Sequence, residues 1–278
     1  MGLCRPIARI SIPYPRFLQP IVMPKLQALI FDVDGTLADT ERDGHRVAFN
    51  RAFKEAGLDW DWDIELYGKL LEVTGGKERM QFYLDRFRPD FQRPANLKQV
   101  IADLHAAKTR HYTQLLAEGA IPLRPGVRRL LLEARDQGMR LAIATTTTPA
   151  NVTALLEHAL APDSLHWFEV IAAGDIVPAK KPAPDIYFYA LEKMGLKPAE
   201  CIAFEDSQNG LISARQARLE TIITINDYTK DHDFSDALLV LDSFGEPGAP
   251  YQVIRGQAGW TTYLDLDLVR QLHQKATM

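Results

Sequence analysis

The sequence of 278 residues has little of what marks several classes of protein. It holds two cysteines, Cys4 and Cys201, which excludes a framework of disulfide bonds and indicates a reducing compartment. No run of roughly 18 apolar residues occurs, which excludes a transmembrane helix. The net charge of −4 gives no overall positive field, so we expect neither nucleic acid nor an anionic membrane as a partner.

The remaining composition is that of a globular protein. Hydrophobic residues make up 46% of the chain and charged residues 24%, which excludes a disordered or collagen-like chain. At roughly 150 residues per domain, this length allows one large domain or two modest ones. We expect a monomer in the cytoplasm that binds a small molecule.

The first 24 residues differ from the rest in charge and in backbone freedom. They contain three arginines and no acid, and removing three from the 32 basic residues leaves 29 against 36 acids, a charge of −7 for the body. Five prolines in this tail prevent a continuous helix. We interpret residues 1–24 as lying outside the natural fold, with Met23 as its natural start. The alternative is a transit peptide, which would direct the protein to the plastid stroma.

Short apolar runs alternate with helical patterns along most of the chain. Runs of strand length occupy residues 26–33, 140–144, 169–172, 201–204 and 220–225. Helical spacing of apolar residues fills the segments between the last four runs. Strands that alternate with helices predict an α/β fold, with a Rossmann-like parallel sheet covered by helices on both faces.

A long block of helical pattern interrupts this alternation. Residues 41–119 carry apolar side chains at helical spacings and no clear strand. We therefore predict a helical cap domain inserted after the first strand, with the core formed by residues 25–40 and 120–278. Beyond residue 225 the pattern weakens to a loop at 245–250 and a closing helix at 264–273.

Polar side chains follow the predicted strands, at the sheet edge where open parallel sheets bind ligands. They are four carboxylates, a hydroxyl and an ammonium: Asp32, Asp34, Thr145, Lys181, Glu205 and Asp206. Carboxylates from two strands can bind Mg²⁺, a hard cation that prefers oxygen ligands. An acidic protein would need such a cation to accept a phosphate, whose oxygens Lys181 and Thr145 could hold.

The two aspartates two positions apart suit a two-step phosphoryl transfer. Asp32 can attack phosphorus to form an aspartyl-phosphate. Asp34 can donate a proton to the leaving oxygen and then activate water. Gly35 would let the chain turn sharply after this pair. The structural alternative, in which the acids cap a helix or bind a structural ion, does not account for the whole set.

These segments resemble the four motifs of the haloacid dehalogenase (HAD) superfamily. The run Asp32-Val-Asp-Gly-Thr is similar to its first motif, Thr145 to the second, Lys181 in KPAPD to the third, and Glu205-Asp206 to the fourth. The resemblance implies that Asp32 is the nucleophile and Asp34 the acid/base. It also implies that Mg²⁺ is held by the side chains of Asp32 and Asp206 and the carbonyl of Asp34, with help from Glu205.

The helical insertion resembles the cap of the β-phosphoglucomutase-like subfamily. The segments ADTERDGHRVAFN and ELYGKLLEVTGGKERM are similar to the CbbY proteins of organisms with the Calvin cycle. That resemblance implies a phosphatase for xylulose 1,5-bisphosphate, an inhibitor of Rubisco. It places a set of residues against the substrate, with Lys77 and Arg79 on the uncleaved phosphate: Glu41, His45, Gly75, Gly76, Lys77, Glu78, Arg79 and Thr146.

Two other functions remain open for the same residues. One is a sugar-phosphate isomerase of the β-phosphoglucomutase type, and another is a promiscuous small phosphomonoester phosphatase. A binding protein that keeps the site without turnover is a third reading, which the intact motif set disfavours. The mutases have one residue fewer between the aspartates and the histidine, and a serine-rich second motif where this chain has threonines. Taken alone, Lys180 is expected to be solvated, as most lysines are.

Overall fold

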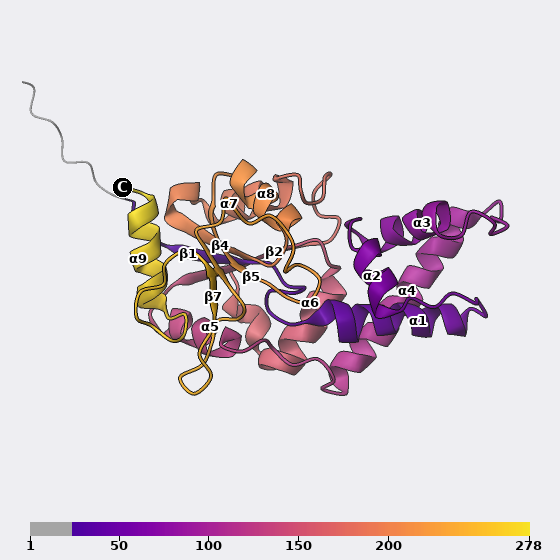
Figure 1. Cartoon of the computed structure of the whole chain (residues 1–278), viewed down its shortest axis with the longest axis horizontal. Helices are drawn as coiled ribbons and strands as arrows, with labels where there is room; N and C mark the ends of the chain where they lie inside the picture. The colour runs from indigo at the N-terminus through magenta and orange to yellow at the C-terminus, as the bar shows by residue number, and fades with distance from the viewer. Residues whose placement is uncertain (1–23) are drawn as a thin grey trace, which may run out of the picture.

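The computed structural model describes residues 24–278, so the prediction for the tail lies, but for Pro24, outside the described residues. The described chain forms an α/β core and a separate helical lobe (Figure 1). The strands are β1 (Ala28–Phe31), β2 (Arg140–Thr145), β3 (Val170–Ala173), β4 (Cys201–Glu205), β5 (Glu220–Thr224), β6 (Leu239–Leu241) and β7 (Val253–Arg255). The core helices are α5 (Val127–Asp136), α6 (Pro149–Leu155), α7 (Asp185–Met194), α8 (Gln208–Gln216) and α9 (Leu266–Ala276).

The seven strands form one sheet in the order β3-β2-β1-β4-β5-β6-β7. All neighbours pair in parallel except β6 and β7, which are antiparallel. This confirms the predicted parallel α/β sheet and adds two strands that the sequence pattern did not indicate. β1 lies between β2 and β4, so the ends of these three strands are adjacent.

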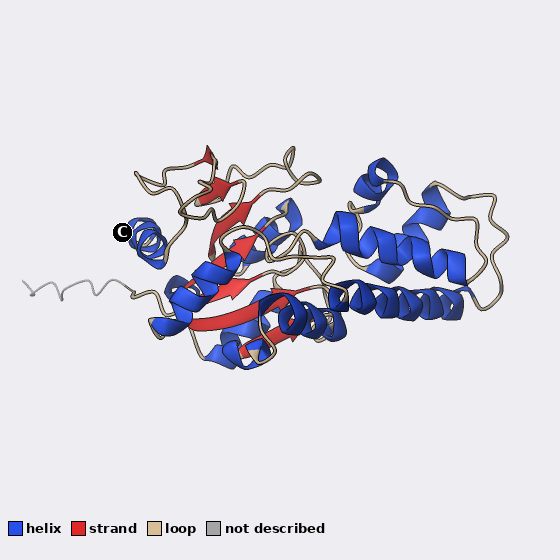
Figure 2. Cartoon of the chain, turned by 90° about the horizontal axis from the view of Figure 1, so that it is seen from below, coloured by secondary structure: helices blue, strands red, loops and turns tan. Residues whose placement is uncertain are grey.

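Helices cover both faces of the sheet, as expected for a parallel sheet (Figures 1 and 2). Alternate residues of β1 face opposite ways: Leu29 and Phe31 pack with α5, α6 and α9, whereas Ala28 and Ile30 pack with α7 and α8. Period-two alternation of wholly apolar strands thus builds two cores, one on each face. The rigid sheet fixes the positions of the loops that follow its strands.

The helical lobe lies beyond the carboxyl ends of the strands, to the right in Figure 2. It consists of α1 (Arg46–Glu55), α2 (Ile64–Leu70), α3 (Gly76–Arg86) and α4 (Leu97–Ala117), preceded by a π-helical turn, Glu41–His45. Its own core is rich in aromatic rings, among them Phe49, Phe53, Trp60 and Trp62. Both chain crossings between core and lobe lie side by side, because Ala38 pairs with Leu123 in an antiparallel bridge.

None of the helices formed by residues 24–278 combines the length and apolarity that crossing a lipid bilayer requires. Cys201, at the start of β4, is buried and forms no disulfide bond within residues 24–278. Burial raises the pKa of its thiol to about 12, so the reactive thiolate form is disfavoured. This cysteine is a core residue and takes no part in the site below.

Candidate active site

Asp32 and Lys181 meet at the centre of the sheet edge. Asp32 directly follows β1, and Lys181 precedes α7. The Lys181 ammonium is buried and donates to Asp32 Oδ1 at 2.7 Å, to Glu205 Oε1 at 2.5 Å and to the carbonyl of Ala144 at 2.8 Å. Burial lowers the pKa of Lys181, but the two carboxylates outweigh burial and raise it, so the lysine stays charged. Lys181 therefore ties the ends of three strands together.

A cluster of three buried carboxylates could hold a cation here. One ligand oxygen from each of Asp32, Glu205 and Asp206 lies within 4.8 Å of the others. Burial, together with the neighbouring acids, raises the pKa of Asp32 to about 8 and that of Asp206 well above its ordinary value. Glu205 Oε2 is buried with no hydrogen-bond partner among the described residues. Crowded acids and an orphaned carboxylate oxygen fit a divalent cation, which would supply the missing positive charge.

The loop after β1 approaches this cluster closely at Gly35. Its φ of +87° is in the region that favours glycine, and a side chain there would collide with the Asp206 carboxylate. Asn226, after β5, donates to Asp206 Oδ2 at 2.7 Å. Loops from β1, β4 and β5 thus converge on one carboxylate, and Gly35 is the residue that permits it.

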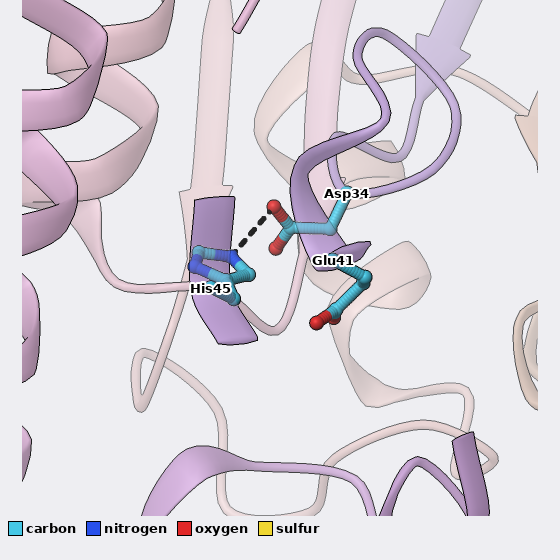
Figure 3. A group of neighbouring side chains, drawn as sticks. All are labelled: Asp34, Glu41 and His45. Atoms are coloured by element: carbon cyan, nitrogen blue, oxygen red, sulfur yellow. Dashed lines mark hydrogen bonds and ion pairs between the residues drawn. The ribbon is translucent and has the colours of Figure 1, made fainter. Parts of the chain in front are cut away.

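Asp34 is held by Thr40, before the lobe, and by His45, in the turn that opens the lobe (Figure 3). Its Oδ1 accepts from the Thr40 hydroxyl at 2.5 Å and lies 2.9 Å from His45 Nε2. His45 Nδ1 in turn lies 2.8 Å from the Lys108 ammonium on α4. Because an ammonium can only donate, Nδ1 is the acceptor and the ring proton is on Nε2, directed at Asp34. Among the described residues no hydrogen bond is made to Oδ2, so this oxygen is the one left for a ligand.

The environment of Asp34 sets its charge. Burial alone would raise the pKa of Asp34, but its interactions with His45, Thr40 and Lys108 lower it below the ordinary range. Burial lowers the pKa of Lys108 from 10.5 to about 8. The pKa values of Asp32 and Asp34 are therefore shifted in opposite directions, which is typical of paired carboxylates with different chemical tasks.

A π-helical turn presents Glu41 and His45 on the same side as Asp34, where Figure 3 shows the three side chains together. Gly44 within this turn packs closely against Tyr112 of α4, and a Cβ there would collide with it. Such single π turns inside helices occur frequently at functional sites. Both ring nitrogens of His45 contact protein groups, and its predicted place against the substrate stays a prediction.

Glu41 and Arg79 lie together, joined by a tyrosine. The Tyr67 hydroxyl donates to Glu41 Oε2, and the Arg79 guanidinium donates to the Tyr67 oxygen at 2.7 Å. Arg79 is buried, lies 3.6 Å from Glu41 Oε2, and its Nε has no partner among the described residues. Arg79 also borders both cavities, so its guanidinium places a positive charge at the cavity wall, with which an anionic group of a ligand could pair.

The turn 75–79 consists of Gly75 and the first turn of α3, and it faces the core. Gly75 has a φ of +99° and Gly76 packs against His105 of α4. Lys77 Nζ lies 3.7 Å from Asp175 Oδ2, and Glu78 Oε1 lies 3.2 Å from Lys180 Nζ.

The expectation that Lys180 is solvated is wrong, because its ammonium is paired and only 23% of its side chain is exposed. One of its two acid partners, Glu78, lies 102 residues earlier in the chain and meets it only across the fold, whereas the other, Asp175, lies in the same loop.

Two neighbouring cavities that share lining residues lie between lobe and core. One, of about 340 Å³, is bordered by the carboxylate cluster and Thr145. A smaller one, of about 130 Å³, is bordered by His45, Lys108 and the turn 75–79. Asp34, Glu41, Arg79 and Thr146 border both. Every residue predicted for the site therefore lies at one of these cavities. Together the two cavities are lined by charged groups from the sheet edge and from the lobe.

Comparison with known proteins assigns the family. A profile of the haloacid dehalogenase-like hydrolases matches residues 26–218. The chain is 48% identical over 249 residues to the plasmid-encoded protein CbbY of Cupriavidus necator, covering 89% of this chain and 97% of that one. It is 53% identical over 213 residues to CbbY of Rhodobacter capsulatus, covering 77% of this chain and 91% of that one.

Solved structures agree with this assignment. CbbY from Rhodobacter sphaeroides in complex with phosphate matches with a TM-score of 0.73 at 48% identity, covering 80% of this chain and 96% of that one. β-Phosphoglucomutase from Clostridium difficile, at 20% identity and a TM-score of 0.68, shares the fold, with 90% of this chain and 98% of that one covered. The chain therefore belongs to the haloacid dehalogenase-like hydrolases, within which it is a phosphatase similar to the CbbY proteins.

Proposed function

We propose that this enzyme is a Mg²⁺-dependent phosphatase that hydrolyses a sugar bisphosphate, xylulose 1,5-bisphosphate being the best candidate, through an aspartyl-phosphate. The observation that carries the proposal is the pair of neighbouring cavities, of which Asp32 and Lys181 border the larger one and the buried Arg79 borders both. A substrate with one phosphate over Asp32 and a second near Arg79 would contact both of these charged regions.

Asp32 is the nucleophile in this proposal. Lys181 occupies its Oδ1, so the other carboxylate oxygen attacks phosphorus while the bond from phosphorus to the sugar oxygen breaks. Lys181 and Thr145 would hold the phosphoryl oxygens. Water then attacks the same phosphorus and the bond from phosphorus to Asp32 breaks. Inorganic phosphate is released and the free Asp32 carboxylate is restored.

Asp34 carries the proton in both steps. In the free protein its pKa is low, so the carboxylate is ionised before substrate binds. The phosphate dianion would raise that pKa, because a nearby negative charge disfavours the ionised form. As its pKa rises, Asp34 takes up a proton from solvent and donates it to the leaving sugar oxygen through Oδ2. In the second step it removes a proton from the attacking water.

Asp32, Glu205 and Asp206 would hold the Mg²⁺, with the Asp34 carbonyl as a further ligand. When bound, the cation would neutralise phosphate charge beside the nucleophile. The helical segment 41–119 would act as a cap on the core formed by residues 25–40 and 120–278. Its closure would exclude water until the sugar has left.

The second phosphate is assigned to the lobe end of the cavities. Arg79 borders both cavities and keeps Nε without a partner among the described residues. Lys77 lies on the same turn at its exposed edge, and Glu41 with Gly75, Gly76 and Thr146 would surround the sugar. A relative supports this assignment: CbbY from Rhodobacter sphaeroides, 47% identical in the compared structure, is known in complex with xylulose-(1,5)bisphosphate.

A panel of sugar mono- and bisphosphates, assayed for phosphate release with Mg²⁺ and with EDTA, tests the proposal. We expect the highest kcat/KM for xylulose 1,5-bisphosphate and loss of turnover with EDTA. An equal kcat/KM for xylulose 5-phosphate would refute recognition of a second phosphate. Conversion of β-glucose 1-phosphate to glucose 6-phosphate without phosphate release would show a mutase instead.

A further inference from the structure

Four charged side chains join the lobe to the core beside the smaller cavity. The Lys180 ammonium lies 3.2 Å from Glu78 Oε1 and 3.2 Å from Asp175 Oδ1, and Asp175 Oδ2 lies 3.7 Å from Lys77 Nζ. Lys77 and Glu78 belong to the first turn of α3, whereas Asp175 and Lys180 belong to the core loop that follows β3. The group, called here the rim clasp, is neutral overall and alternates in sign from one residue to the next.

Lys180 is the central member of the rim clasp. It contacts an acid on each side, and 23% of its side chain is exposed, against 50% for Lys77, 49% for Glu78 and 70% for Asp175. Its ion pair also holds the pKa of Asp175 below the usual range, through a hydrogen bond and the positive charge. Removing Lys180 would therefore leave the two acids facing each other across the gap between lobe and core.

The backbone at Gly75 is shaped around this pair. A side chain at Gly75 would collide with the Glu78 carboxylate and come within 3.0 Å of Lys180 Nζ. The φ of +99° at Gly75 further restricts the position to glycine. The turn that carries Arg79 into the cavity is thus folded against the Glu78–Lys180 pair.

Lys180 is also the sequence neighbour of Lys181, which bonds Asp32 and Glu205. Two adjacent lysines therefore connect the reacting end of the site and the lobe turn through one short stretch of backbone. We propose that Lys180 is a positioning residue, which, through Glu78 and Asp175, holds the turn 75–79 over the active site so that Arg79 meets the substrate. The inference rests on the phosphatase activity. In it, Glu78 binds Lys180 of the core and does not bind the substrate.

The size of the effect follows from exposure. Ion pairs this accessible to water change an equilibrium constant by up to about fivefold each. Lys180→Gln removes two pairs, so we expect KM for the best sugar phosphate to rise about three- to tenfold. The value of kcat should stay within about twofold, because Lys180 makes no contact with Asp32 or Asp34 among the described residues.

A double-mutant cycle tests the assignment, with Glu78→Gln, Lys180→Gln and the double variant compared with the wild type at low and high NaCl. We expect Lys180→Gln to cost much less in the Glu78→Gln background, Lys180→Arg to restore KM, and NaCl to affect the double variant least. The matched control is Glu65 and Lys69 of α2, an exposed pair at 2.8 Å within the lobe, where Glu65→Gln and Lys69→Gln should leave KM within about 1.5-fold.

Independent effects of Glu78→Gln and Lys180→Gln would overturn the inference, because a lysine that binds the substrate directly acts without Glu78. A fall in kcat with unchanged KM would overturn it as well. These outcomes differ from failure of the proposed function, in which the wild type itself would not prefer a sugar bisphosphate. The cycle can be run on whichever phosphomonoester the wild type hydrolyses best.

Discussion

The replacement His45→Asn separates the orientation of Asp34 from the rest of the site. The shorter side chain removes both the 2.9 Å contact to Asp34 Oδ1 and the acceptor for Lys108. Asp32, Lys181 and the carboxylate cluster make no hydrogen bond to His45 among the described residues, so the nucleophile and the proposed cation site should be retained.

The expected magnitude follows from the bond that is lost. A hydrogen bond to a charged group contributes about 1.5–3 kcal/mol. If that orientation is fully used in the transition state, kcat/KM falls by about 10- to 150-fold, at 1.36 kcal/mol per factor of ten. Thr40 still donates to Asp34 Oδ1 in this variant. The fall in kcat/KM should therefore be smaller than the fall caused by removing the Asp34 carboxylate itself.

The assay is phosphate release from the preferred sugar phosphate, with the thermal midpoint measured alongside. The matched control is His111→Asn, a lobe histidine that lies 2.7 Å from Glu55 and borders neither cavity. We expect that control to keep kcat/KM within about twofold. Equal activity of His45→Asn and the wild type would refute the role assigned to the chain from Lys108 to Asp34.

Three further predictions concern charge inside the fold. Lys108→Met should lower kcat/KM about tenfold without lowering the urea midpoint at pH 7, because burial shifts the lysine pKa from 10.5 to about 8 and so costs the folded state roughly 3 kcal/mol. That cost is present below pH 8 and fades toward pH 10.5, so a stability difference that does not change over this interval would contradict it. Arg124→Met should lower the free energy of unfolding, measured in urea, by at least about 3 kcal/mol. The buried guanidinium of Arg124 donates to four carbonyls, those of Gly35, Thr224, Ile225 and Asp242, and a loss below about 1 kcal/mol would contradict this. Mg²⁺ should raise the thermal midpoint more at pH 8 than at pH 5, because the metal needs the ionised carboxylate and the pKa of Asp32 is raised to about 8. Equal increases of the midpoint at the two pH values would argue against the carboxylate cluster as the metal site.

The fold could be predicted where burial leaves a pattern in the sequence. Strands buried on both faces read as apolar runs, which made β1 to β5 visible. β6 has three residues, too few to show a period, and β7 is an antiparallel edge strand whose residues are exposed. α6 ends earlier than its pattern indicates, because a π-helical turn at Leu156–Leu160 continues the apolar spacing.

The functional site, like the fold, could be predicted from the sequence only in part. Asp32 and Asp34 follow a recognisable strand, so their place at the sheet edge could be argued from the residues. Lys108 could not be found, since it meets His45 only through packing of α4, 63 residues later in the chain. Tyr67, which joins Glu41 to Arg79, carries no signal that separates it from an ordinary core tyrosine of α2. Partners that meet only across the fold leave no local pattern.

The central claim is that Asp32 attacks the phosphate, and Asp32→Asn tests it most directly. The side chains are similar in size, so the fold should be retained, and the amide cannot form the aspartyl-phosphate. Phosphate release from the wild type's preferred substrate is measured at saturating Mg²⁺. We expect turnover at least about 1,000-fold below that of the wild type. Turnover within tenfold of the wild type would contradict it.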